Sequence, residues 1–292
     1  MCDELTVKDA NKFLGGTGSL TRRQFSTLSV GVGLSMLLPK AAHAQAVTEV
    51  DVDVPTPDGT ADSYFVHPSS GAHAGVIIWP DILGLRPAFR MMGRRLAESG
   101  YSVLVVNPFY RSAKAPVVSE GASFQDDETR NIVLPMARAL NPETHMTDAR
   151  ALVSFLDQQD AVNTNRKIGT MGYCMGGPIT MRTAGAVPER VGAGASFHGG
   201  GLVTDAPDSP HSLVPKMNAD FLFAIAANGD ERDPEAQNVL RESYASAELP
   251  AEIEVYEDTL HGWCPPDSAV YNEARAERAW SRLLVLFEAA LG

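Results

Sequence analysis

The sequence predicts a single α/β domain in which a mostly parallel, doubly wound sheet carries helices on both faces. Continuous apolar runs at residues 75–79 and 101–106 are typical of strands that are buried on both faces of a sheet. A helical pattern at residues 86–99, which Gly100 closes, separates these two runs. Strands that alternate with helices in this way form parallel sheets, and neither an internal repeat nor a linker divides the chain after residue 45.

The other expected elements continue this alternation. A period-two pattern at residues 50–54 predicts a half-buried strand, and a turn signal at 57–59 leads into a returning strand at 61–67. Further strands are expected at residues 167–171, 191–197, 221–227 and 253–256. Further helices are expected at residues 126–140, 147–158 and 275–291, and Pro135 should kink or split the first of them. The long irregular stretch at residues 107–125 is of the kind that lines sites in α/β domains.

The composition excludes several classes of protein. The chain has 292 residues, with 24 Lys+Arg against 36 Asp+Glu, which gives a net charge of -12 and a pI of about 5. A nucleic-acid partner is disfavoured because a phosphate-binding face needs clustered Lys and Arg. The three cysteines are too few for a disulfide scaffold.

Residues 1–44 are expected to be an export signal that precedes the folded domain at 45–292. Arg22 and Arg23 form a paired-arginine motif, residues 26–39 carry no charge, and Ala42-His43-Ala44 has the small-x-small pattern of a cleavage site. The segment thus resembles a twin-arginine signal, so the precursor should use the twin-arginine export machinery and the processed protein should be periplasmic or extracellular. The uncharged stretch of 14 residues is shorter than the roughly 20 that span a bilayer, so no stable membrane anchor is expected. A buried or disordered N-terminal helix is the alternative.

The strongest local motif is Gly172-x-Cys174-x-Gly176-Gly177, which lies between a short strand and a helix. A nucleophile on a strand-to-helix elbow needs small neighbours because the turn is tight and strained. The elbow also places the thiol near a helix N-terminus, whose dipole and N–H groups favour a thiolate and, later, an oxyanion. The motif therefore predicts that Cys174 is a nucleophile, and the alternative is a buried structural cysteine in a glycine-rich turn.

A cysteine nucleophile needs a base, and the base needs an acid that orients it. Asp230 and His261 follow the last two expected strands, and α/β folds place their sites at the carboxyl ends of strands. We therefore predict that His261 is the base and Asp230 the orienting acid, with Asp233 as the rival acid. Among the other histidines, His198 ends an expected strand, where it can line the pocket.

These motifs resemble those of the dienelactone hydrolase family, which has the α/β-hydrolase fold. The resemblance covers nearly all of residues 46–292, and it rests on Pro80-Asp81-Ile82-Leu83-Gly84-Leu85, Gly172-Tyr173-Cys174-Met175-Gly176-Gly177, Gly229-Asp230 and His261-Gly262. It implies a Cys174-Asp230-His261 triad that cleaves a small-molecule ester or lactone through a thioester, as a carboxymethylenebutenolidase does. No metal and no organic cofactor is expected.

The resemblance also implies roles for the residues around the triad. The oxyanion hole would be formed by the backbone N–H groups of Ile82 and Met175. Asp81 lies where the family has a glutamate that interacts with the resting thiol, and it is expected to support the site.

Family members that open dienelactones bind the substrate carboxylate with two arginines and a tyrosine. Arg130 lies where one of these arginines is expected, whereas Leu134 and Pro265 occupy the tyrosine and second arginine positions. Tyr110 and Arg111, in the long irregular stretch, are candidates for a substitute. Bidentate arginines bind a carboxylate best, so this departure weakens the expectation of a dienelactone substrate.

Two other hypotheses use the second cysteine. Cys174 and Cys264 are the only cysteines after residue 44, and two nearby thiols pair in an oxidising compartment. A non-catalytic or redox thiol protein on the same fold is therefore the second hypothesis. A metal site at His261-x-x-Cys264 lacks the second His/Cys pair that a structural zinc site needs.

Overall fold

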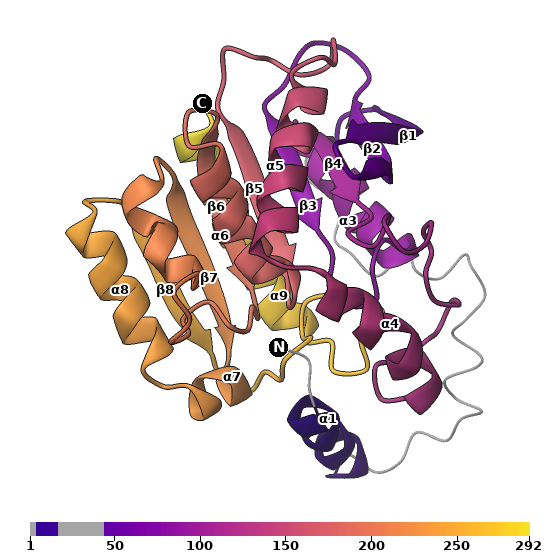
Figure 1. Cartoon of the computed structure of the whole chain (residues 1–292), viewed down its shortest axis with the longest axis vertical. Coiled ribbons are helices and arrows are strands. Elements are labelled where there is room, and N and C mark those ends of the chain that lie inside the picture. The colour runs from indigo at the N-terminus through magenta and orange to yellow at the C-terminus, as the bar shows by residue number, and fades with distance from the viewer. Residues whose placement is uncertain (1–3, 17–43) are drawn as a thin grey trace.

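Eight strands form one sheet in the computed structural model, which describes residues 4–16 and 44–292 (Figure 1). The order of the strands across the sheet is β1-β2-β4-β3-β5-β6-β7-β8. Their bounds are β1 (Val47–Thr56), β2 (Gly59–Pro68), β3 (Gly75–Trp79), β4 (Ser102–Val106), β5 (Ile168–Tyr173), β6 (Val191–Phe197), β7 (Asp220–Ala226) and β8 (Ala251–Tyr256). The predicted fold class is confirmed.

The parallel part of the sheet runs from β4 to β8. Ile77 of β3, for example, lies between Leu104 of β4 and Thr170 of β5, and both pairings are parallel. β1 and β2 extend the sheet beyond β4 with antiparallel pairings. Since the carboxyl ends of parallel strands share one edge, the loops after β3, β5, β6, β7 and β8 all meet at that edge.

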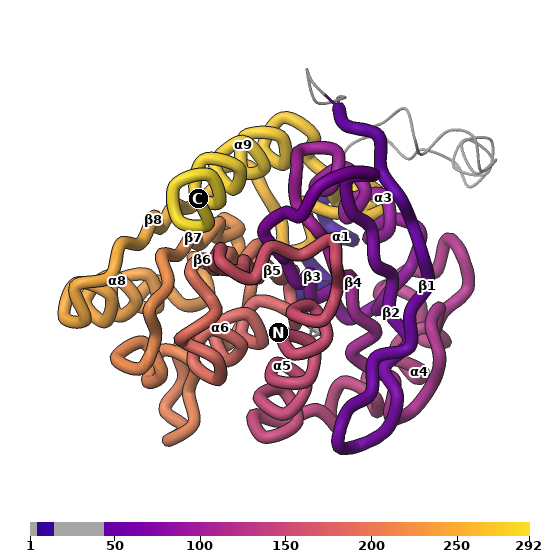
Figure 2. The backbone as a smooth tube through the Cα atoms, turned by 90° about the horizontal axis from the view of Figure 1, so that it is seen from above, coloured from indigo at the N-terminus to yellow at the C-terminus, as the bar shows by residue number. Residues whose placement is uncertain are grey.

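Helices cover both faces of the sheet, as the sequence predicts (Figure 2). On one face lie α3 (Pro87–Glu98) and α9 (Glu273–Ala290), and on the other lie α5 (Pro142–Leu156), α6 (Gly176–Ala186) and α8 (Ala236–Ser246). Successive strand residues point to opposite faces, so Val76 and Ile78 pack on the α3/α9 side while Ile77 and Trp79 pack on the α5/α6 side. This double burial explains the continuous apolar run in β3.

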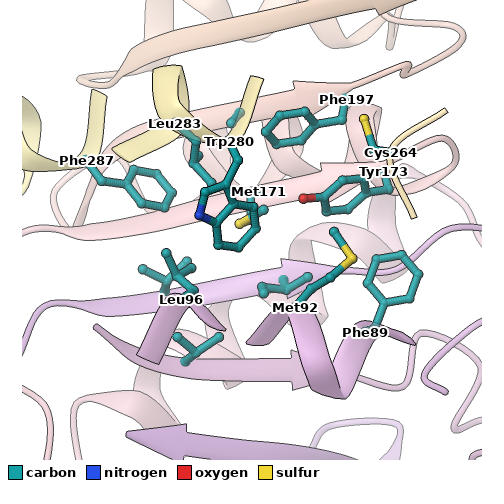
Figure 3. Close-up of a cluster of buried hydrophobic side chains, with 14 of the residues drawn as sticks. Phe89, Met92, Leu96, Met171, Tyr173, Phe197, Cys264, Trp280, Leu283 and Phe287 are labelled. Atoms are coloured by element: carbon teal, nitrogen blue, oxygen red, sulfur yellow. The ribbon is translucent and has the colours of Figure 1, made fainter. Parts of the chain in front are cut away.

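The core on the α3/α9 side fixes the end of β5, the strand that leads into the predicted elbow. Figure 3 shows this cluster, which includes Met92, Leu96, Met171, Tyr173, Trp280, Leu283 and Phe287. Tyr173 stacks on Phe197 of β6 with ring centroids 4.8 Å apart. Each fully buried side chain of this size contributes about 1.5–3 kcal/mol to stability, so the residue before Cys174 is firmly anchored.

Two helices differ from their predicted form. α4 (Asp127–Ala139) is one helix although Pro135 lies inside it, so of the predicted kink or split at Pro135 the split is wrong. Pro135 and Asn131 are both exposed, so the Asn131 carbonyl group, which Pro135 leaves without an N–H partner, is open to solvent. α5 begins earlier than expected because the Asn141 side chain accepts hydrogen bonds from the N–H groups of Glu143 and Thr144.

A further helix precedes the sheet in the chain. α1 (Glu4–Gly16) lies beyond the carboxyl edge of the sheet, between α4 and α7 (Ala227–Arg232), as Figure 1 shows. Arg22, Arg23 and the apolar run at 26–39 lie outside the described residues, so the structure leaves the export signal a prediction. Within residues 4–16 and 44–292, no helix is long and apolar enough to cross a bilayer.

Candidate active site

Cys174 lies on a tight turn between β5 and α6. Its φ of 53° falls in the left-handed region that L-residues seldom adopt, and two backbone hydrogen bonds hold it there. The N–H of Cys174 donates to the carbonyl oxygen of Phe197 (3.0 Å), and the N–H of Gly177 donates to the carbonyl oxygen of Cys174 (3.1 Å). Cys174 is 2% exposed and lies two residues before the first residue of an 11-residue helix, whose N-terminal dipole favours a thiolate.

The glycines around Cys174 are required by close backbone packing. A Cβ atom on Gly172 would lie 2.1 Å from the carbonyl oxygen of Gly176, and one on Gly176 would lie 2.3 Å from the carbonyl oxygen of Trp79. A Cβ atom on Gly177 would lie 2.5 Å from Ser196 Oγ. The elbow therefore forms only because the ends of β3, β5 and β6 and the start of α6 meet without side chains between them.

One cavity lies beside Cys174 at the carboxyl edge of the sheet. Cys174 and His261 both line it, so the structure brings together the predicted nucleophile and the predicted base. Its other titratable or charged lining residues are Asp81, Arg86, His198 and Asp267. Residues 121–125 also line this cavity, which confirms that the irregular stretch at 107–125 contributes to a pocket.

Asn228, which the sequence analysis did not single out, positions the loop that carries His261. Its side chain is buried at the end of β7, and its Oδ1 accepts a hydrogen bond from the backbone N–H of His261 (2.8 Å). His261 itself is 9% exposed. One amide side chain thus ties the loop after β8 to the loop after β7, and a buried polar group of this kind is costly to lose.

Asp230 lies on the short helix α7 rather than in the expected loop. It lines a second cavity together with His261 and His198, so His261 lies between the cavity of Cys174 and the cavity of Asp230. Gln237 Nε2 donates to Asp230 Oδ1 (2.9 Å), and Asp230 is half-buried. The rival acid Asp233 lines the same second cavity but is exposed.

His198 is a buried histidine at the end of β6. Its imidazole ring meets that of His261 edge-on, with centroids 5.1 Å apart, and its φ is 42°. Neither ring nitrogen has a hydrogen-bond partner among the described residues. Burial, aided by the charge of His261, holds the pKa of His198 well below its usual value. The ring is therefore neutral and presents a free nitrogen beside the catalytic candidates.

Asp81 follows β3 and is bound to Arg86. Arg86 Nη1 and Nη2 donate to the two carboxylate oxygens of Asp81 at 2.6 and 2.9 Å, and the N–H of Leu83 donates to Asp81 Oδ1 (2.9 Å). Burial raises the pKa of the Asp81 carboxyl, and the charge of Arg86 opposes that rise. Arg86 was expected only to begin a helix, and its partner Asp267 was not singled out.

The expected oxyanion donors lie on either side of the elbow. Ile82 follows β3 and lines the cavity of Cys174, while Met175 follows Cys174 and directly precedes α6. Among the described residues, neither backbone N–H group donates a hydrogen bond within the protein. Ile82 is a lining residue of the cavity, whereas Met175 is not, so their joint role as oxyanion donors stays a prediction.

The candidate substrate ligands lie elsewhere. The Arg130 guanidinium donates to the carbonyl oxygens of Phe124 (2.8 Å) and Gln125 (2.6 Å) and pairs with Asp127. Tyr110 and Arg111 both bind the carboxylate of Asp148. None of these three candidates lines the cavity that contains Cys174.

The helix α1 covers part of this cavity. Thr6, Val7 and Ala10 are among its lining residues. Asp9 accepts a hydrogen bond from Asn228 Nδ2 (2.8 Å) and forms an ion pair with Arg232. Asp9 thus binds α1 to α7, whose Asn228 holds the loop that carries His261.

Cys264 packs in the core on the α3/α9 face of the sheet and does not line this cavity. Figure 3 shows it among Tyr173, Phe197 and the α3/α9 cluster, and it lines a separate small cavity. Cys174 and Cys264 are not joined by a disulfide, and burial raises the pKa of Cys264 well above its usual value. Within the described part of the chain, no group of three or more His, Cys, Asp or Glu residues is arranged to hold a metal ion.

Comparison with known proteins identifies the family to which this fold belongs. The sheet order, the helices on both faces and the elbow after β5 define an α/β-hydrolase fold. The chain belongs to the dienelactone hydrolase family, whose sequence profile matches residues 61–291. It is accordingly an enzyme of the ester- and lactone-hydrolysing class.

Individual relatives are distant. A carboxymethylenebutenolidase of Rhodococcus opacus is 27% identical over 245 residues, which cover 79% of this chain and 87% of the relative. The solved structure of a dienelactone hydrolase-like promiscuous phosphotriesterase from metagenomic libraries aligns with a TM-score of 0.67 at 20% identity, over 85% of this chain and all of that one. A dienelactone hydrolase from Anabaena variabilis aligns with a TM-score of 0.60 at 16% identity, over 84% of this chain and 99% of that chain.

Replacing Gly172 with Ala should lower the free energy of unfolding by about 3 kcal/mol or more, because the added methyl group collides with the carbonyl group of Gly176. Gly229→Ala is the matched control: the nearest atom to its added methyl group lies 3.9 Å away, and the expected change is below about 1 kcal/mol. Chemical denaturation followed by circular dichroism measures both. Equal stability of Gly172→Ala and wild type would contradict the described packing.

Proposed function

We propose that the protein hydrolyses a small ester or lactone with Cys174 as the nucleophile, His261 as the proton carrier and Asp230 as the acid that orients His261. The observation that carries this proposal is the position of Cys174, on a strained elbow at the start of α6 and in the same cavity as His261. The relative in Rhodococcus opacus is a carboxymethylenebutenolidase, which supports an ester or lactone as the substrate class.

In the acylation step, His261 takes the thiol proton and Cys174 Sγ attacks the carbonyl carbon of the substrate. The carbonyl π electrons move to oxygen, and the N–H groups of Ile82 and Met175 stabilise the resulting oxyanion. When this intermediate collapses, the C–O bond to the leaving alcohol breaks, and the imidazolium of His261 protonates the leaving oxygen. The acyl group is then a thioester on Cys174.

In the deacylation step, water replaces the alcohol. His261 takes a proton from the water as its oxygen attacks the thioester carbon, and a second oxyanion forms in the same hole. Collapse of that intermediate breaks the C–S bond, the acid product leaves, and the proton returns from His261 to Cys174. Only protein groups and water take part in these two steps.

The acid assignment is supported by the two cavities around His261. Asp230 shares the second cavity with His261 and is partly buried, whereas Asp233 is exposed. An orienting carboxylate acts best where solvent does not screen its charge. The redox-pair alternative has less support, because Cys264 packs in the α3/α9 core and does not line the cavity of Cys174.

Replacing Cys174 with Ala should lower kcat for aryl esters by at least about 1,000-fold, since the nucleophile is lost while the cavity remains. Cys264→Ala is the matched control, because it removes the other described thiol from the core and should keep kcat within about threefold. Steady-state hydrolysis of p-nitrophenyl esters measures both. A Cys174→Ala variant that keeps the wild-type rate would rule out this mechanism.

We also propose that residues 1–44 are a twin-arginine export signal and that residues 45–292 act in the periplasm or outside the cell. The order of a paired arginine, an uncharged apolar stretch and a small-residue site supports this proposal. Cleavage after Ala44 would also remove α1, and with it Thr6, Val7 and Ala10 from the cavity lining.

Expression of the full chain in a bacterium with a twin-arginine system should give a periplasmic protein whose N-terminus lies near Gln45. Replacing Arg22 and Arg23 with Lys should keep the uncleaved chain in the cytoplasm, because export depends on the arginine pair. Fractionation with intact-mass analysis measures both outcomes. A wild-type chain that stays full length in the cytoplasm would disprove the export proposal and leave the proposed chemistry untouched.

A further inference from the structure

Arg86 is held between two carboxylates beside Cys174. Its Nη1 and Nη2 atoms donate to Asp81, while its Nε and Nη2 atoms donate to Asp267 Oδ2 (2.6 Å) and Oδ1 (3.0 Å). Nη1 also donates to the carbonyl oxygen of Gly84 (3.3 Å). We name this arrangement the Asp81–Arg86–Asp267 bridge.

The guanidinium of the bridge has no donor left for a ligand. A guanidinium has five N–H groups, and the four carboxylate oxygens with the Gly84 carbonyl supply an acceptor for each of them. The ring of Phe89 covers one face of the guanidinium at 4.8 Å, and Arg86 is only 7% exposed. Arg86 therefore cannot pair with a further carboxylate without breaking one of its two existing bidentate pairings.

No other charged residue that lines the cavity in the described structure supplies a cationic donor in place of Arg86. Among the described lining residues, Arg86 is the only Arg or Lys, whereas both Asp81 and Asp267 are present. Arg130 binds the carbonyl oxygens of Phe124 and Gln125, which line the cavity, and Arg111 binds Asp148; neither arginine is itself a lining residue. With neutral histidines the lining carries a net charge of -1, and protonation of Asp81 would still leave Arg86 balanced by Asp267.

We propose that this cavity accepts esters or lactones whose acyl group is uncharged, and that the Asp81–Arg86–Asp267 bridge excludes substrates that carry a carboxylate there. This inference rests on the proposed function. A carboxylate that enters the cavity loses its hydration, meets no free cationic donor, and lies near two carboxylates of the protein. Such unpaired burial of charge is a common means of rejecting a wrong ligand.

The test compares p-nitrophenyl butyrate with mono-p-nitrophenyl succinate, in which a carboxylate replaces the terminal methyl group. Wild-type kcat/KM should be at least about 100-fold higher for the butyrate, because only the succinate has to bury an unpaired charge. Asp267→Asn retains the shape of the side chain but removes the charge that pairs with Arg86 Nε and Nη2. The ratio of kcat/KM for the succinate to kcat/KM for the butyrate should therefore rise at least about 10-fold. A wild-type enzyme that prefers the succinate, or an unchanged ratio in folded Asp267→Asn, would overturn the proposal.

The matched control is Asp51→Asn, which removes one negative charge from an exposed pair with Arg90 on the distant strand β1. It should leave the ratio within about twofold, because exposed charges are screened by solvent and salt. A rise equal to that of Asp267→Asn would show that net charge, and not the bridge, sets the selectivity.

Alkylation of Cys174 measures the same selectivity without turnover. Its sulfur displaces iodide from iodoacetamide, which is neutral, or from iodoacetate, which is anionic, and peptide mass spectrometry gives both rates. Relative to free cysteine, iodoacetate should be disfavoured at least about 10-fold in wild type and less so in Asp267→Asn. Selective alkylation of a protein that hydrolyses neither ester would contradict the proposed function alone, whereas equal relative rates would contradict this inference alone.

Discussion

The geometry of the site depends on one steric constraint, the close approach of four backbone segments around Cys174. Gly176 packs against the carbonyl group of Trp79, so the elbow is tied to the end of β3, which leads into Asp81 and Ile82. Gly177 packs against Ser196, which ties the same elbow to the end of β6 and to His198. The strain at φ 53° is offset by the rigid core beneath it, where Tyr173 stacks on Phe197. A displacement at any of these contacts would move Cys174 relative to the loops that surround it.

Electrostatic order around the elbow is built within the protein and does not need a ligand. Arg86 is balanced by two carboxylates, His198 is kept neutral by burial, and Asn228 holds the backbone of the His261 loop through its side-chain amide. Groups fixed in this way do not have to reorganise when charge develops on a substrate. The pairing of Arg86 with Asp81 and Asp267 also limits what the cavity can bind, because its guanidinium N–H groups already donate to carboxylates and are not available to an anionic ligand.

Much of the fold and part of the site could be predicted because their signals are local in the sequence. Apolar runs gave the buried strands, and the glycine spacing around Cys174 reported a turn that tolerates no side chain. The bridge could not be predicted, since Arg86 and Asp267 are 181 positions apart and meet only through the arrangement of the loops. The position of His198 at a strand end could be predicted, but not that its ring would be buried with no hydrogen-bond partner among the described residues, which depends on the surrounding loops. The predicted split at Pro135 is wrong because this residue is exposed. Solvent can reach the one carbonyl group that proline leaves without a partner, and the sequence pattern did not reveal this exposure.

If Cys174 forms a covalent acyl intermediate, a rapid acid quench during hydrolysis of a saturating aryl ester should trap it. Deacylation of a thioester is usually slow after an activated leaving group, so the intermediate should accumulate. We expect one acyl group per chain, on the peptide that contains Cys174, and we expect neutral hydroxylamine to release that acyl group. Turnover with the acyl group on another residue, or with an unmodified Cys174 throughout, would contradict the account.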